Sequence, residues 1–287
     1  MRVLDSHLHL WDPGRLDYDW LDGALDGRFA ADELAAARLG DAGAEAAVFV
    51  QAECVEGQHL DEARWVAEIA DEVGVRAIVA GARLDRGRET SEHLAALDGV
   101  GLVAGIRHLL QDEPPGLATT PVFLDGAREV AARGWTFDAC VRAPGIGDVA
   151  ALATAVPELP IVLDHLGKPA VGTARAPLEP AASWRRDLGE LARHPQVCGK
   201  LSGLPAEAGG DWDAAQLAPF LDAALEAFGP ERLMWGSDWP VSAVGPAGYD
   251  RTSRAAWFEA VATWARAREL DLDALFWGNA ARFYGIR

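Results

Sequence analysis

The sequence has few cysteines and no long apolar run. Its three cysteines are Cys54, Cys140 and Cys198, and no two of them form a Cys-x-x-Cys pair. An odd, unpaired set of this kind predicts reduced thiols rather than a disulfide framework. No stretch of about 18 apolar residues is present to span a bilayer, and the N-terminus lacks the basic and apolar segments of a secretory signal. Together these absences predict a cytoplasmic protein.

Positive charge is also scarce. Lys and Arg number 26 against 44 Asp and Glu, which gives a formal net charge of -18 at pH 7. Such a protein repels phosphate backbones and anionic bilayers, so we expect neither nucleic acid nor membrane as a partner. A small-molecule substrate is the expected partner, and the sequence is compatible with a homo-oligomer. Only two of the 26 basic residues are lysines, Lys168 and Lys200.

Short apolar runs alternate with amphipathic helical patterns over the 287 residues. Eight runs, each with about the four to eight residues of a buried parallel strand, begin near Val3, Ala46, Ala77, Val103, Thr136, Ile161, Val197 and Leu233. Helical patterns occupy 32–39, 60–73, 90–97, 122–133, 149–156, 184–193 and 217–228 between these runs, and 257–268 and 272–284 after the last one.

This alternation indicates a parallel sheet with right-handed crossovers. Eight units favour an α/β fold of the (β/α)8 TIM-barrel type, with a single domain over residues 1–287. A doubly wound sheet would carry a Gly-rich phosphate loop after the first strand, whereas this chain continues with His7-Leu-His9-Leu-Trp11. The barrel is therefore the expected fold.

Polar residues follow the predicted strands, at the end of the barrel where such enzymes place their active sites. The candidates, in chain order, are His7, His9, Gln51, Glu53, Arg107, His108, Asp138, Arg142, Asp164, His165, Lys168, Lys200, Ser202, Ser237 and Asp238. Both lysines of the chain are among these candidates. Their position indicates a function for lysine at this face of the barrel, and the alternative is that it follows from the amino-acid composition alone. Loops at 12–29, 111–121 and 168–180 are expected on the same face, and the first has the composition of an ordered lid.

The His-x-His pair is the strongest of these signals. In a strand, His7 and His9 present both imidazoles to one face, which suits a metal ion or a substrate carbonyl. Asp238 follows the last apolar run, so it meets the pair if the first and last strands of a closed barrel are neighbours. Backbone-bonded histidines and a capping carboxylate are the non-catalytic interpretations. We favour a functional site, with His165 as a further member.

Other candidates are assigned lesser roles. Glu53 and Asp138 are expected to support the site rather than to react. We expect solvent exposure and no role for the three histidines of the helical segments, which are His59, His93 and His194.

The motifs together resemble the amidohydrolase superfamily of metal-dependent hydrolases. They lie at 5–13, 17–21, 105–107, 161–169, 233–240 and 278–285, in an order that covers nearly the whole chain. The resemblance is to the branch of sugar-lactone (L-fuconolactone and L-rhamnonolactone) and 2-pyrone-4,6-dicarboxylate lactonases. It implies a (β/α)8-barrel hydrolase that opens the ring of a small lactone, most readily an aldonolactone.

The resemblance leaves two alternatives for a cofactor. Metal-rich members of the superfamily have a Lys or carboxylate after the fourth strand and a His after the fifth. This chain has Arg107 and His108 after the fourth and Asp138 and Cys140 after the fifth, so a two-metal centre is not expected. One divalent ion, with zinc as the expected type, held by His7, His9 and Asp238, is the first alternative. A site without metal, as the resemblance to metal-free members of this branch implies, is the second.

Lactone hydrolysis needs a polarised carbonyl and a deprotonated water. We predict Asp238 as the general base, with His7, His9 and His165 as the other catalytic residues. The candidates for substrate binding are Arg107, His108, Lys168, Arg142, Trp11 and Trp239. The alternatives are a metal-dependent decarboxylase, an amide hydrolase of the same superfamily, and a catalytically silent barrel that binds a sugar acid.

Overall fold

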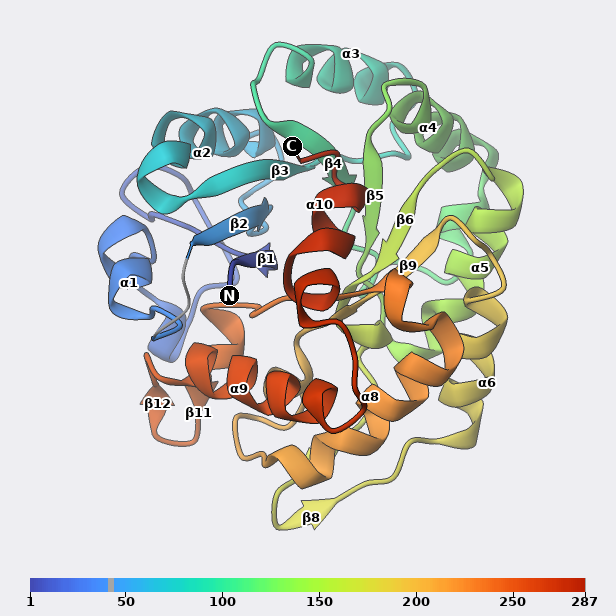
Figure 1. The fold of residues 1–287 in the computed structure, drawn as a ribbon. Helices are drawn as coiled ribbons and strands as arrows, with labels where there is room; N and C mark the ends of the chain where they lie inside the picture. Colours follow the sequence, from blue (N-terminus) through green and yellow to red (C-terminus); the bar gives the residue numbers. More distant parts are fainter. Residues whose placement is uncertain (41–43, 287) are drawn as a thin grey trace.

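The computed structural model describes residues 1–40 and 44–286, and eight parallel strands form its centre (Figure 1). In spatial order these are β1 (Val3–Leu8), β2 (Glu45–Val50), β3 (Val75–Gly81), β4 (Val103–Arg107), β5 (Thr136–Ala139), β6 (Ile161–Leu163), β9 (Val197–Leu201) and β10 (Leu233–Trp235). Every predicted run is a strand that begins within two residues of its expected start. The (β/α)8 fold is therefore confirmed.

The two ends of the sheet meet just beyond β1 and β10. The His9 amide donates to the carbonyl of Trp239 at 2.8 Å, and the Asp238 amide donates to the carbonyl of His7 at 2.8 Å. Leu8 and Trp239 form a parallel bridge there. Because this contact joins the first strand to the segment after the last, it places the His-x-His pair beside Asp238.

Helices surround the barrel, as Figure 1 shows. They are α1 (Ala31–Ala36), α2 (His59–Val73), α3 (Arg88–Leu97), α4 (Pro121–Ala132), α5 (Ile146–Ala155), α6 (Ala182–Leu191), α7 (Leu204–Glu207), α8 (Ala214–Phe228), α9 (Ser253–Arg266) and α10 (Asn279–Phe283). In α2, Ala63, Val66, Ala70 and Val73 are buried at the three- and four-residue spacing that turns one helix face to the barrel. Gly74 ends this helix with φ +71°, a left-handed conformation that favours glycine.

Two short hairpins, β7–β8 (Gly172–Thr173 and Ala176–Pro177) and β11–β12 (Val244–Gly245 and Gly248–Tyr249), decorate the loops after β6 and β10. The segment expected as one helix over 272–284 is instead a π-helical turn, Ala274–Gly278, followed by α10. In Figure 1, α10 lies in front of the barrel opening, and Tyr284 packs with the buried residues of the strands that begin there.

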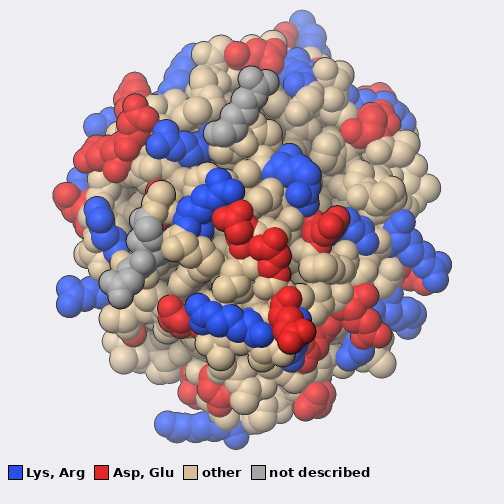
Figure 2. Space-filling view, viewed as in Figure 1, with Lys and Arg blue, Asp and Glu red and all other residues tan. Residues whose placement is uncertain are grey.

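The surface carries both charge signs. Figure 2 shows acidic and basic side chains interspersed on the face seen in Figure 1, so the excess of acid does not gather there in one patch. Among the described residues, none of the helices is both long and apolar enough to cross a membrane.

Candidate active site

A cavity of about 400 Å³ opens where the barrel strands end. Its walls come from the segments that follow β1, β2, β4, β5, β6, β9 and β10, together with the loop 12–29. The lining residues are His9, Trp20, Ala52, Glu53, Arg107, Leu109, Gln111, Asp112, Cys140, His165, Lys168, Gly203, Ala206, Glu207, Asp238 and Val241. This position is the one that barrel enzymes use for catalysis.

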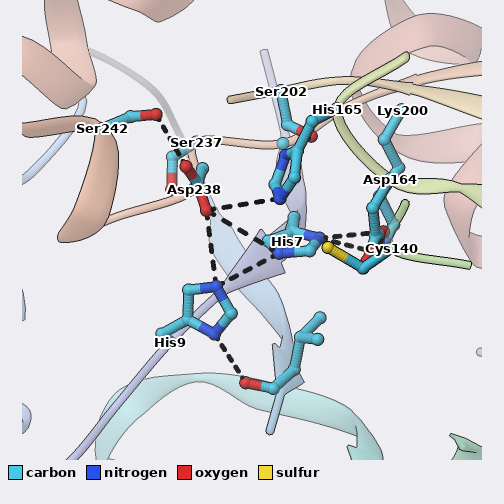
Figure 3. Close-up of polar contacts among 12 residues, drawn as sticks. His7, His9, Cys140, Asp164, His165, Lys200, Ser202, Ser237, Asp238 and Ser242 are labelled. Atoms are coloured by element: carbon cyan, nitrogen blue, oxygen red, sulfur yellow. Dashed lines mark hydrogen bonds and ion pairs between the residues drawn. The ribbon is translucent and has the colours of Figure 1, made fainter. Parts of the chain in front are cut away.

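Asp238 lies at the centre of the polar cluster in this cavity (Figure 3). Its Oδ1 is 3.4 Å from His9 Nε2, 3.7 Å from His165 Nε2 and 3.8 Å from His7 Nε2. Its Oδ2 accepts a hydrogen bond from Ser242 Oγ at 2.7 Å. The carboxylate is thus held from one side and presents the other oxygen to three imidazoles.

The strand ends orient this cluster through close backbone approaches. At Gly236, a Cβ atom would lie 2.7 Å from His7 Cβ, and at Gly203, with φ +71°, it would lie 2.4 Å from His165 Cγ. Only glycine permits these contacts. Asp238 and His165 themselves have positive φ values of 55° and 54°, a conformation that costs free energy in non-glycine residues and recurs at functional sites.

Two imidazoles are also fixed by their second ring nitrogen. His9 Nδ1 lies 2.8 Å from the carbonyl oxygen of Val50. Because a carbonyl only accepts, Nδ1 carries a proton, and His9 Nε2 is the ring nitrogen that faces Asp238. His165 Nδ1 pairs with Ser202 Oγ at 2.9 Å.

Burial sets the charges of these groups. Burial lowers the pKa of His165 to about 4 and that of His7 well below its usual value, despite nearby carboxylates. Burial opposes ionisation of Asp238, but contacts with His165 and His9 outweigh it and lower the pKa of this carboxyl. At neutral pH the site therefore contains the Asp238 carboxylate beside the neutral imidazoles of His7 and His165, which is what a general base and its hydrogen-bonding partners require.

The same residues fit a divalent ion. His7, His9 and Asp238 are buried, and their ligand atoms all lie within 4.8 Å of one another. Two imidazole nitrogens and one carboxylate are the three protein ligands of a catalytic zinc site with an open position. A second set, His7, Asp164 and His165, meets the same distance condition. The expectation that this cluster can hold one metal ion is confirmed.

A second layer of charge lies under the cluster. Lys200 Nζ is 2.5 Å from Asp138 Oδ2, 3.0 Å from Asp164 Oδ1 and 3.0 Å from His7 Nδ1. Tyr284 donates to Asp138 Oδ2 at 2.9 Å. Burial raises the pKa of Asp138 to about 6, whereas Lys200 keeps the pKa of Asp164 well below the usual range in spite of burial. The sequence had placed Lys200 at the cavity mouth, but the side chain is fully buried in the barrel.

Arg107 and Lys168 line the cavity, as predicted. Arg107 donates to the carbonyl of Gln51 at 2.5 Å, and Lys168 Nζ donates to Gln111 Oε1 at 2.5 Å. Glu53, for which we expected a supporting role, also lines the cavity. These groups give the walls both donors and acceptors.

Three predicted substrate-binding residues, His108, Trp11 and Trp239, do not line the cavity. His108 stacks on Phe123 at 5.4 Å and is bonded to the Leu84 amide, since its neighbour Arg107 takes the inward direction. Trp11 and Trp239 are fully buried in the packing around the loop 12–29.

Other expectations are changed in part. Arg142 is exposed at the rim, 3.4 Å from Asp112. His59, His93 and His194 are half-buried rather than exposed, and His93 Nε2 bonds the carbonyl of Gly81 at 2.9 Å.

Some residues of the site escaped the sequence analysis. Gln111, Asp112 and Glu207 line the cavity from loops and from α7, and their only signal was a position shortly after a strand. Asp5, inside the first motif, accepts from the Ser237 amide at 2.8 Å and pairs with Arg254 at 3.0 Å. Asp5 thereby ties β1 to the segment that carries Asp238.

Comparisons with known proteins agree with this geometry. The family model described as amidohydrolase matches residues 4–286. An L-fucono-1,5-lactonase of Burkholderia multivorans is 37% identical over 302 residues, which cover 99% of this chain and 96% of the relative. An L-fucono-1,5-lactonase of Burkholderia ambifaria is 31% identical, with 99% and 95% covered. The crystal structure of a Burkholderia multivorans amidohydrolase with bound zinc superimposes with a TM-score of 0.83 and 34% identity, over the full length of both chains.

Proposed function

Because this chain belongs to the amidohydrolase family, we propose that it is a hydrolase that opens the ring of a small sugar lactone, with L-fucono-1,5-lactone as the first substrate to test. The observation that carries the proposal is the ionised Asp238 in the cavity wall beside His9 and His165, with His7 buried behind them. A lactone carbonyl placed there meets a base for water and N–H donors for its oxygen. The two lactonase relatives support the same reaction.

In the proposed reaction, Asp238 takes a proton from a water molecule, and the oxygen of that water attacks the lactone carbonyl carbon. The bond between this carbon and the ring oxygen then breaks, the ring oxygen takes the proton back from Asp238, and the product is a hydroxy acid whose carboxyl group ionises and releases one proton. His165 and His7 donate to the developing oxyanion, and each such donor contributes on the order of 3 kcal/mol. Ser242 holds Asp238 in place through its hydrogen bond of 2.7 Å.

His7, His9 and Asp238 are the residues that would hold a divalent ion. When bound, such an ion polarises a carbonyl and lowers the pKa of a coordinated water towards about 7. In that case His7 and His9 would give ring nitrogens to the ion, whereas His165, which is not one of these three ligands, would keep its place beside Asp238 at 3.7 Å as a donor.

The cavity walls favour a neutral, hydroxyl-rich substrate. Arg107 and Lys168 supply donors, whereas Glu53, Asp112 and Glu207 supply acceptors from other walls. Each sugar hydroxyl both donates and accepts, so mixed walls suit it, while a dicarboxylate would meet three acidic side chains. Trp20 lines the cavity as an aromatic side chain against which a sugar ring can pack, and its indole nitrogen donates to the carbonyl of Ala52 at 2.8 Å.

The test is a pH-indicator assay, because each ring opening releases one proton. L-Fucono-1,5-lactone, L-rhamnono- and L-galactonolactones, and 2-pyrone-4,6-dicarboxylate form the panel. Turnover of the sugar lactones is expected. Release of carbon dioxide from a hydroxybenzoate, or hydrolysis of an amide, without lactone turnover would replace the proposal with one of the other superfamily activities, and binding without any turnover would indicate a silent barrel.

A cytoplasmic location is part of the proposal, and the three free cysteines support it. A homo-oligomer stays a prediction, which light scattering of the purified protein tests.

A further inference from the structure

Lys200 has no task in the chemistry proposed above, yet it is one of only two lysines and lies fully buried under the site. A buried ammonium is costly unless its partners compensate it. Asp138 and Asp164 pair with it, at 2.5 Å and 3.0 Å. The third polar neighbour, His7 Nδ1 at 3.0 Å, connects it to the site.

The position of the proton on His7 depends on this contact. Lys200 has donors only, so its hydrogen bond to Nδ1 uses the Nδ1 lone pair and leaves the ring proton on Nε2. Asp164 Oδ1 is also near Nδ1, at 3.2 Å. However, neither oxygen of Asp164 has a hydrogen-bond partner with good geometry among the described residues, so the ring nitrogen is directed at Lys200.

The opposite nitrogen of His7 gives the same answer independently. His7 Nε2 and His9 Nε2 are 3.2 Å apart. In the neutral form of the His9 ring, Nε2 has a lone pair, because the one ring proton is on Nδ1 and bonds the Val50 carbonyl at 2.8 Å. A hydrogen bond of 3.2 Å between the two rings therefore requires a proton on His7 Nε2 (Figure 3).

We infer that Lys200 is a positioning residue that holds His7 as the Nε2–H form, through the chain Lys200 to His7 to His9 to the Val50 carbonyl. This inference rests on the proposed function for its consequence, because a lactone oxygen that replaces the His9 nitrogen as acceptor would receive the His7 N–H. A metal ion binds a ring nitrogen through its lone pair, and the proton on His7 Nε2 already uses that lone pair. Lys200 thus weakens the binding of zinc by His7, His9 and Asp238, and zinc must displace this hydrogen bond to enter.

The direct test is ¹⁵N NMR of the metal-free wild-type protein labelled at histidine, with the His7 signals identified by comparison with His7→Gln. The expected spectrum has a protonated Nε2 and an unprotonated Nδ1 for His7 at neutral pH. A protonated Nδ1, or protons on both nitrogens, would overturn the inference. This measurement needs no lactone, so it stands or falls separately from the proposed function.

Two matched variants test the cause. Lys200→Met and Lys200→Gln, each combined with Asp138→Asn to keep the buried charge balanced, have side chains of equal length and no charge, but only glutamine has an N–H donor. We expect the Met variant to move the His7 proton to Nδ1, where Asp164 accepts it, and to bind zinc at least 10-fold more tightly than the Gln variant. Equal zinc affinities, or equal His7 spectra, would show that Lys200 does not act through this donor.

Lys168→Met is the control for charge. Lys168 lines the cavity and is bonded to Gln111, so its removal takes one positive charge from the site and leaves the His7 partners in place. Its His7 spectrum should match that of the wild type. Circular dichroism melts establish that each variant is folded, and the wild-type spectrum decides the inference if a variant is not.

Discussion

Glu62→Gln should abolish the loss of stability that the ionisation of buried Glu62 is expected to cause in the wild type as the pH rises. Glu62 is buried in α2, accepts from the Ala52 amide at 3.1 Å and from the Tyr18 hydroxyl at 3.4 Å, and has a second oxygen without a partner among the described residues. Burial raises its pKa from 4.5 to about 8. The folded protein therefore keeps this proton between about pH 5 and pH 8, whereas the unfolded chain releases it.

The sign and size follow from proton linkage. Because the folded state binds one proton more in this window, the free energy of unfolding falls by about 1.4 kcal/mol for each pH unit of increase. The full contribution is present below about pH 5 and is lost as the pH rises towards 8. Between pH 5.5 and 7.5, the ionisation of Glu62 should lower the free energy of unfolding of the wild type by about 3 kcal/mol. Glu62→Gln should not show this decrease.

Urea unfolding followed by circular dichroism at pH 5.5, 6.5 and 7.5 measures the effect. As the pH rises, the free energy of unfolding of Glu62→Gln should increase relative to that of the wild type. Tyr18→Phe is the control, because it removes the hydroxyl contact and leaves Glu62 able to titrate, so it should keep the wild-type slope. Parallel curves for wild type and Glu62→Gln would refute the reasoning.

Three further predictions concern the site. Asp238→Asn should lower kcat by roughly 100-fold or more while the protein stays folded, and near-normal turnover would remove Asp238 as the base. Zinc titration followed by metal analysis should reach no more than one ion per chain, and His9→Ala should abolish it; a second tightly bound ion would contradict the assigned ligands. Lys168→Met should raise KM for a neutral lactone more than it lowers kcat, and a wild-type preference for 2-pyrone-4,6-dicarboxylate would instead assign Arg107 and Lys168 to a carboxylate clamp.

The order of strands and helices was determined by the sequence itself. Buried parallel strands are short apolar runs and barrel helices are amphipathic at a spacing of three to four residues, so both patterns are local and survive without knowledge of the fold. The pairing of His7 with His9 is local for the same reason. Their meeting with Asp238 followed from a single further assumption, that the sheet closes.

The tertiary structure alone decided which neighbouring side chains face the cavity. Arg107 and His108 alternate, and only the packing of His108 on Phe123 settles that Arg107 points inward. Trp11 and Trp239 are motif residues, but the folding of the loop 12–29 over them makes them part of the core. The tertiary structure also separates the two lysines, because Lys168 lines the cavity and Lys200 is buried beneath it. Both follow the pattern of a strand end, and only the contacts of Asp138, Asp164 and His7 from three other strand segments make Lys200 a buried partner of the site. Such contacts join residues far apart in the chain, and their geometry depends on barrel closure and side-chain packing, which no local pattern encodes.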